Sequence, residues 1–323
     1  MAAAASVPAA RRLVAGPHRS GRSRSKGPQT AVVAEPWGRL DQLGDGVWAL
    51  TSTPWAGDRD SGAWRTVCNG GIIAGRDAVL AVEGFGSIEG AAWLADMAEK
   101  LAGRRPTHVV LTHVHGDHTS GTAGYERGAD PLQVITTDRT RKLLLEREAK
   151  AEPSSARRLL VPDHILPADG EPTEIDLGGR TVRLVARAGH TPSDLVLYVS
   201  APRVVFCGDL LWNRYFPNYV DAIPTKLATH CEELLSDPEV RYIAGHGSLP
   251  TFEDARSYLG LIDLVGEAAR RAFEAGRPAD EAAAGFEIPK SLGEWTYFSP
   301  RYPEVAFNAW YRDLRGESTE AGG

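Results

Sequence analysis

The sequence predicts a layered α/β domain built from short buried strands and amphipathic helices. The chain has 323 residues, 42% of them hydrophobic and 24% charged, which is an ordinary composition for a globular protein. Short β-rich runs alternate with helix-length runs, and no repeat of 20–50 residues is visible. No apolar run approaches the roughly 20 residues that span a bilayer, so we expect no transmembrane helix.

Nine β-rich runs form the expected strands. They lie at 47–52, 70–74, 78–82, 107–112, 133–136, 180–187, 195–199, 203–207 and 241–244. Several have Gly or Asp at their edges, as strands commonly do. We therefore expect most of the sheet structure between residues 47 and 244.

Helical stretches lie between and after these runs. Ser87 is a suitable cap for a helix that ends near Gly103, and Asp138 for a helix over 139–150. Thr251 begins a capping pattern ahead of a long helix over 252–274. Pro278 and Pro303 suit the first turns of two further helices. We expect one helix after Pro278 and one over 303–314.

The two ends of the chain differ from its middle. Residues 1–34 hold six basic residues and no Asp or Glu, and the rest of the chain has 30 basic and 42 acidic residues, a formal charge of −12. We expect 1–35 to be a disordered extension or a targeting segment, 36–313 to be one catalytic domain, and 314–323 to be a flexible tail. The acidic body argues against a nucleic-acid partner.

The cysteine content favours a reducing compartment. Cys68, Cys207 and Cys231 are too few and too widely spaced for a disulfide framework or a Cys-rich zinc site. We expect a cytoplasmic protein, with organellar targeting or export by the basic N-terminal segment as the alternative. Cys207 precedes Gly-Asp on an apolar run and is interpreted as a core residue.

One histidine cluster is the strongest chemical signal in the chain. Residues 112–121 read Thr-His-Val-His-Gly-Asp-His-Thr-Ser-Gly, which places His113, His115, Asp117 and His118 within six positions. The apolar run before them predicts a strand, so the cluster lies where a strand ends and a loop begins. Imidazole and carboxylate groups together bind zinc, iron or manganese.

Three later motifs fit the same site. His190, Asp209 and His246 each follow a glycine and come directly after a β-rich run. Together with the first cluster they give five histidines and two aspartates from four strand ends. Such a set is large enough for two divalent ions.

In this order, the motifs resemble those of the metallo-β-lactamase-fold superfamily. The resemblance covers about 40–313 and implies a four-layer αββα sandwich with metals at the edge between two sheets. It implies one metal on His113, His115 and His190, a second on Asp117, His118 and His246, and Asp209 bridging the two. The flanking residues are more similar to SoxH-like and glyoxalase II-like hydrolases than to true β-lactamases.

The resemblance implies a metal-dependent hydrolase with Zn²⁺, two ions per chain, or with iron or manganese instead. A metal pair lowers the pKa of a bridging water, and the resulting hydroxide attacks the carbonyl of a small thioester, lactone or lactam. Asp117 would be both ligand and catalytic group. The alternative is a mononuclear iron sulfur dioxygenase acting on a persulfide through His113, His190 and Asp209. A homodimer would rest on analogy alone.

Aromatic residues near these motifs indicate a substrate pocket. Trp55 and Trp64 lie in the loop between two early strands, and Trp212, Asn213 and Tyr215 follow Asp209. Aromatic and amide side chains beside a metal site are typical of a pocket wall, although ordinary core packing explains buried aromatics equally well.

Glu83 stands where many members of the superfamily carry an aspartate. Its carboxylate either hydrogen-bonds to a ligand histidine or is a solvated loop group, and the sequence leaves both open.

Overall fold

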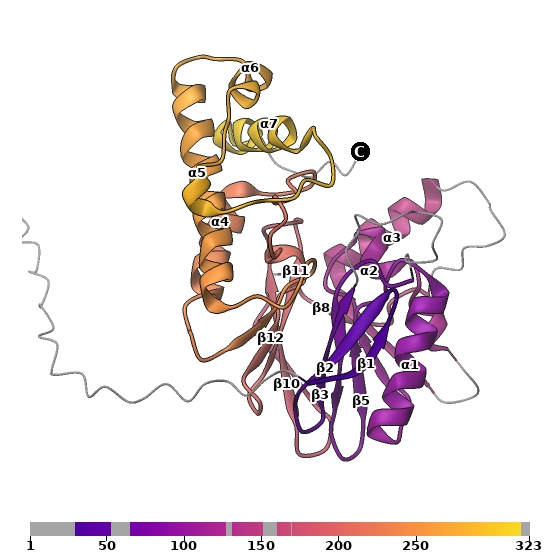
Figure 1. The fold of residues 1–323 in the computed structure, drawn as a ribbon. Coiled ribbons are helices and arrows are strands. Elements are labelled where there is room, and N and C mark those ends of the chain that lie inside the picture. The colour runs from indigo at the N-terminus through magenta and orange to yellow at the C-terminus, as the bar shows by residue number, and fades with distance from the viewer. Residues whose placement is uncertain (1–29, 53–64, 127–130, 151–159, 169, 318–323) are drawn as a thin grey trace, which may run out of the picture.

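The computed structural model describes residues 30–52, 65–126, 131–150, 160–168 and 170–317. Their strands form two sheets, one of eight strands and one of five, and helices cover the outer face of each (Figure 1). The predicted pocket residues Trp55 and Trp64 lie outside the described residues.

The first sheet follows chain order from one edge to the other. Its first five strands are antiparallel neighbours, and β5 to β8 run parallel. The strands are β1 (Thr30–Glu35), β2 (Gly38–Gly44), β3 (Val47–Ser52), β4 (Gly70–Ala74), β5 (Val79–Val82), β6 (His108–Val110), β7 (Gln133–Thr137) and β8 (His164–Leu166).

The second sheet has the order β13-β12-β11-β10-β9. Its strands are β9 (Thr173–Asp176), β10 (Thr181–Arg187), β11 (Asp194–Val199), β12 (Val204–Phe206) and β13 (Arg241–Ile243). Only the β12–β13 pair in this sheet is parallel. The carboxyl ends of β12 and β13 therefore meet at one edge, where loops can bring side chains together.

The helices complete the outer layers. They are α1 (Ile88–Ala102), α2 (Gly116–Thr119), α3 (Asp138–Lys150), α4 (Pro224–Leu234), α5 (Phe252–Glu274), α6 (Ala279–Ala284) and α7 (Tyr302–Leu314). Short 3-10 turns occupy Thr122–Tyr125, Gly208–Leu210 and Lys290–Leu292. Figure 1 shows α1 and α3 beside the first sheet, and α4 and α5 beside the second.

Three hydrophobic clusters define the layers. Apolar side chains of both sheets, such as Leu80, Leu184 and Phe206, pack between the sheets. A second cluster joins the first sheet to α1 and α3, and a third joins the second sheet to α4, α5 and α7. Each sheet therefore buries one face against the other sheet and one against helices, which confirms the predicted four-layer αββα sandwich.

The helix caps follow the sequence signals. Ser87 Oγ accepts a hydrogen bond from Gly90 N at the start of α1, and Gly103 ends that helix with φ of 72°. Thr251 and Asp254 form a reciprocal capping box at the start of α5. These side chains satisfy backbone groups that a helix end leaves unpaired.

Several elements were not predicted. Strand β1 lies inside the segment 1–35 that was expected to be an extension, and it pairs with β2. Strands β2, β8 and β9 and helix α4 were also missed. In the first sheet this adds two strands ahead of the first expected one.

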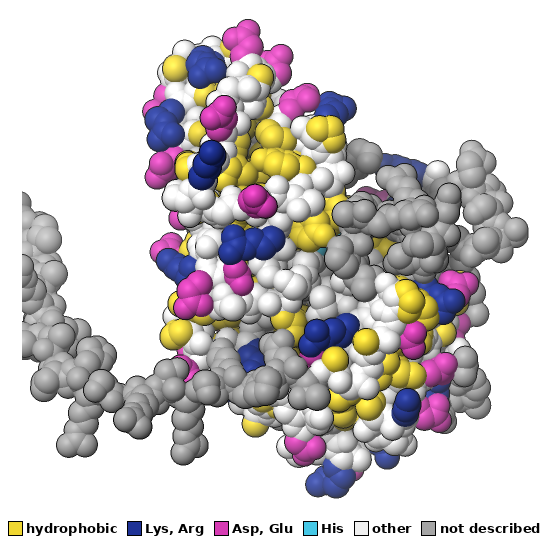
Figure 2. All heavy atoms as spheres, in the orientation of Figure 1, with side chains coloured by type: hydrophobic (Ala, Val, Ile, Leu, Met, Phe, Trp, Pro, Cys, Tyr) yellow, Lys and Arg dark blue, Asp and Glu magenta, His cyan; other side chains and the backbone are white. Residues whose placement is uncertain are grey.

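The surface around α5 and α6 mixes charges of both signs. Figure 2 shows dark-blue and magenta side chains interspersed on this face of the molecule, so no field of a single sign covers it. Among the described residues, no helix combines the length and apolar character that a bilayer crossing requires.

Candidate metal centre

Seven side chains from four strand ends meet at one edge of the sandwich. His113, His115, Asp117 and His118 follow β6 in the first sheet. His190, Asp209 and His246 follow β10, β12 and β13 in the second sheet. The structure therefore brings together all seven predicted ligand residues, in two groups whose ligand atoms lie within 4.8 Å of one another.

The first group has three histidines around one point. His115 Nδ1 lies 3.1 Å from His113 Nε2 and 3.0 Å from His190 Nε2. Asp209 Oδ2 lies 3.3 Å from His190 Nε2 and 3.7 Å from His113 Nε2.

The second group lies on the other side of Asp209. Asp209 Oδ1 is 3.2 Å from His118 Nε2 and 3.5 Å from His246 Nε2. Asp117 Oδ2 is 3.2 Å from His246 Nε2 and 3.7 Å from His118 Nε2. The two oxygens of Asp209 thus face different groups, and this carboxylate lies between them.

The donor set fits two divalent ions. Ligands about 2.0–2.1 Å from a tetrahedral ion lie about 3.3 Å from one another, and the distances within each group scatter around that value. His118 Nε2 and Asp209 Oδ1 are buried and have no hydrogen-bond partner among the described residues. Buried polar atoms of this kind require a partner, and a metal ion supplies one for both.

Hydrogen bonds fix the orientation of the first-group imidazoles. Thr112 Oγ1 donates to Glu83 Oε1 at 2.6 Å, so it accepts from His113 Nδ1 at 3.0 Å. His190 Nδ1 donates to the carbonyl oxygen of Asn218 at 3.2 Å. Both rings therefore keep the Nε2 lone pair directed at the centre.

His115 faces the centre with the other nitrogen. Its Nε2 lies 2.8 Å from Asp221 Oδ2, which leaves Nδ1 for the first group. The carboxylate thereby fixes the tautomer and the orientation of the His115 ring. Sequence reasoning missed Asp221, because it lies 106 positions from His115 in a segment with no motif.

Glu83 is a buried partner of the ligands and not a solvated loop group. Its side chain accepts hydrogen bonds from Thr112 N and Oγ1, and Oε1 lies 3.1 Å from His118 Nδ1. Glu83 is 1% exposed. The structure therefore supports the first role that the sequence left open, in which Glu83 is a hydrogen-bond partner of a ligand histidine.

Burial and charge shift the ionisation of the site in opposite directions. Burial lowers the pKa of His190 to about 3 and holds that of His113 well below its usual value. Burial also acts against protonation of His246, but Asp209 and Asp117 outweigh it and raise its pKa to about 9.

The two aspartates of the site are stabilised as anions. Burial raises the pKa of both, but the charges of His118 and His246 prevail and hold the pKa of Asp117 and of Asp209 below the usual range. The site is therefore a cluster of imidazoles and carboxylates in which deprotonated oxygens are available as ligands.

Close packing requires a glycine before His246. A Cβ atom on Gly245 would lie 2.0 Å from Asp209 Oδ1. Asn69 holds the same loop from the first sheet, with its Nδ2 donating to the carbonyl oxygens of Ala244 and Gly247 at 2.8 Å each. Asn69 is a second positioning residue that sequence reasoning missed.

A cavity of about 430 Å³ opens onto the metal ligands. One wall is apolar and is formed by Trp212, Val220, Phe298 and Tyr302, while Asp221 lies on the side of His115. The ring of Phe298 packs edge-on against Trp212 and His246. The C-terminal segment ahead of α7 thus helps to enclose the site.

The predicted pocket residues after Asp209 have different surroundings. Trp212 is 3% exposed and lines this cavity. The centroid of its ring lies 4.7 Å from the centroid of the His246 ring. Asn213 Nδ2 donates to the backbone and hydroxyl oxygens of Ser248, and Tyr215 stacks on Phe298. Asn213 and Tyr215 line an adjoining cavity of about 270 Å³. Cys207 is fully buried among core side chains, as predicted.

The chain belongs to the metallo-β-lactamase superfamily. The model of this family, described as "Metallo-beta-lactamase superfamily", matches residues 68–246, which is more than half of the chain and includes all seven ligand residues. The prediction of a metallo-β-lactamase-like hydrolase is confirmed at the level of the family.

The chain is also similar to individual proteins. It is 29% identical over 261 residues to a hydroxyacylglutathione hydrolase from Acidiphilium cryptum (strain JF-5), covering 80% of this chain and 88% of that protein. A metallo-β-lactamase from Pontibacter korlensis matches with a TM-score of 0.56 at 18% identity, over 70% of this chain and 99% of that one. The sec-alkylsulfatase Pisa1 from Pseudomonas sp. matches with a TM-score of 0.67 at 16% identity, over 87% of this chain and 51% of that one.

Proposed function

We propose that this protein is a dinuclear zinc hydrolase that cleaves a small ester-like substrate, namely a thioester, lactone or lactam. The observation that carries this proposal is the position of Asp209. Its two carboxylate oxygens face separate ligand groups, with Oδ2 toward His190 and Oδ1 toward His118. A carboxylate shared in this way suits two ions better than one.

The ligand residues of the chain would hold the two ions in two separate groups. His113, His115 and His190 would hold one ion, Asp117, His118 and His246 the other, and Asp209 both. When bound, such a pair supplies Lewis-acid polarisation of a carbonyl and lowers the pKa of water.

Asp117 is the candidate catalytic group. Its side chain is 30% exposed and faces the cavity, in contrast to the 2% exposure of Asp209. A carboxylate held there can orient an attacking water and carry a proton to the leaving group. The apolar wall of Trp212 and Phe298 would bind the substrate and exclude water from it.

The relative from Acidiphilium cryptum supports a thioester as the first substrate to assay, because its name specifies hydrolysis of a hydroxyacylglutathione. The sequence-based alternative, an iron sulfur dioxygenase, would use only His113, His190 and Asp209. It leaves the second ligand group without a role.

The test is elemental analysis of protein purified without added metal and without chelator, followed by assays on thioesters, lactones and lactams. We expect about two zinc ions per chain and hydrolysis of at least one class. About one iron per chain, with oxygen uptake on a persulfide and no hydrolysis, would overturn the proposal.

The variant His115→Ala removes one ligand from the first group. We expect it to lose metal and activity together, because the remaining groups no longer form a complete set of ligands. His164→Ala, which changes an exposed histidine of β8, is the matched control and should keep both. A fully metallated, active His115→Ala protein would contradict the ligand assignment.

A further inference from the structure

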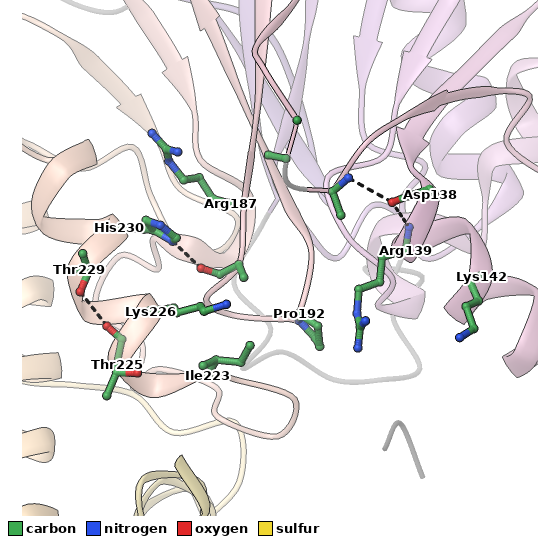
Figure 3. Close-up of a pocket in the computed structure, with 14 residues that line it drawn as sticks. Asp138, Arg139, Lys142, Arg187, Pro192, Ile223, Thr225, Lys226, Thr229 and His230 are labelled. Atoms are coloured by element: carbon green, nitrogen blue, oxygen red, sulfur yellow. Dashed lines mark hydrogen bonds between the residues drawn. The ribbon is translucent and has the colours of Figure 1, made fainter. Parts of the chain in front are cut away.

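A second cavity lies behind the loop that carries His190. It has a volume of about 930 Å³, within the range of small-molecule sites, and Figure 3 shows residues that line it. Ala188 and Pro192, on either side of His190, belong to its wall. Among the described residues, the cavity shares no lining residue with the one that opens onto the candidate metal ligands.

Four cationic residues from three elements line this cavity. Arg139 and Lys142 come from the first turn and a half of α3, Arg187 from the end of β10, and Lys226 from the first turn of α4. In Figure 3, Arg139 and Lys226 lie on the two sides of Pro192. Among the described residues that line the cavity, one is acidic, Asp138.

Two of these cations have weak acidic partners and two have none. Lys142 Nζ lies 3.9 Å from Glu146, and an Arg187 nitrogen lies 3.7 Å from Glu233. Neither Arg139 nor Lys226 forms an ion pair with any residue in the described part of the chain. The buried Nε of Arg139 also lacks a hydrogen-bond partner there.

Two described acids near the cavity accept hydrogen bonds from neutral donors. Asp138 Oδ1 accepts hydrogen bonds from the backbone nitrogens of Arg139 and Ala168. Asp313 Oδ2 accepts from Thr225 N and Oγ1 at 2.8 Å each. His230 donates from Nδ1 to the carbonyl oxygen of Ala188 at 2.6 Å. None of these contacts involves the side chain of Arg139 or Lys226, so both side chains lack a carboxylate partner among the described residues.

We propose that this cavity binds the anionic oxygens of a small molecule, a phosphate or carboxylate group, between Arg139 and Lys226. Like charges held near one another repel, and an anion between them removes that repulsion. Guanidinium forms paired hydrogen bonds to such oxygens, and ammonium adds a point charge. The site is separate from the metal centre and does not depend on the proposed hydrolysis.

The experiment is calorimetric titration of the metal-loaded protein with inorganic phosphate and, separately, with succinate. The double variant Arg139→Gln, Lys226→Gln removes both unpaired cations. The control, Arg256→Gln, Lys290→Gln, removes two exposed cations outside the cavity. A charge-preserving variant, Arg139→Lys, Lys226→Arg, reports on folding and on the need for charge alone. The three are compared with the wild type at one ionic strength.

We expect the double Gln variant to bind the preferred anion at least about tenfold more weakly than the wild type. The control and the charge-preserving variant should bind within a few-fold of the wild type. Tighter binding of phosphate or of succinate identifies which of the two groups the cavity takes. Equal binding by the wild type and the double Gln variant would place the anion elsewhere, for instance at the metal centre. That result, or no binding of either anion, would overturn the proposal.

Discussion

Glu83 combines a strained backbone with a side chain that contacts several neighbouring residues. Its φ of 78° lies in the left-handed region, which non-glycine residues rarely occupy, and such strain costs about 1–3 kcal/mol. The carboxylate nevertheless contacts both Thr112 and His118. Strain of this kind persists where the surroundings fix a functional group, and here the group orients the histidine of the second ligand set.

The variant Glu83→Gln keeps the size of the side chain and removes its charge. We expect it to fold and to bind metal about 10–100-fold more weakly, because the contact with His118 loses its anion. Competition with a fluorescent chelator measures the affinity. Glu89→Gln, an exposed position in the first turn of α1, is the control. Unchanged affinity in Glu83→Gln would show that the carboxylate has only a structural role.

Sequence patterns identified the ligand candidates but not all of the residues that position them. The seven metal-ligand candidates were recognisable because His and Asp occur in short motifs after strands. Asp221 and Asn69 have no such motif, and they reach His115 and the His246 loop only through the tertiary fold. For Glu83 the sequence left two roles open, a hydrogen-bond partner of a ligand histidine or a solvated loop group. Only its burial in the folded structure decides between them.

Helix α5 shows how a local signal determines an element. Its capping box includes hydrogen bonds from Asp254 N to Thr251 Oγ1 at 3.1 Å and from Thr251 N to Asp254 Oδ2 at 3.0 Å. Asp254 Oδ1 also lies 2.5 Å from Arg214 in the segment after Asp209. The cap thus connects the helix layer to the chain that leads from the metal centre.

Replacing Thr251 by Ala removes the side-chain cap. We expect a loss of about 1 kcal/mol in the free energy of unfolding, with metal content unchanged, because the Asp254 N–H loses its acceptor. Urea unfolding followed by circular dichroism measures the change. Ser257→Ala, at a half-buried position within the same helix, serves as the comparison. Equal stability of Thr251→Ala and the wild type would show that the cap contributes nothing net.

The elements that sequence reasoning missed lack the signals on which it depends. Strand β9 is a four-residue strand with no buried position, so it shows no clear apolar face. Strand β1 follows a long segment rich in Ala, Gly and Arg, and it joins the first sheet by pairing with β2. Helix α4 begins at Pro224. The aromatic run that precedes it was interpreted as a pocket wall, and no helix was predicted after it.

The candidate metal centre contains residues from both sheets. Four ligand candidates follow β6 of the first sheet, and three follow strands of the second. Polar contacts also cross between the sheets at this edge, such as those of Asn69 with the His246 loop, of Leu195 N with Thr112 O and of Thr137 with Ser193. Ions at this point would therefore link the sheets directly, in addition to any role in catalysis.

Removal of metal should consequently lower the stability of the whole domain. A ligand present at about 1,000 times its Kd stabilises the native state by about 4 kcal/mol, and each kcal/mol corresponds to about 2–4 °C for domains of about 150–250 residues. We expect excess chelator to lower the melting temperature by roughly 10 °C, as measured by calorimetry. His115→Ala protein should show a much smaller chelator effect, because it starts without a full complement of metal. If elemental analysis shows that the wild type has lost its metal and the melting temperature is unchanged, the ions do not hold the sheets together.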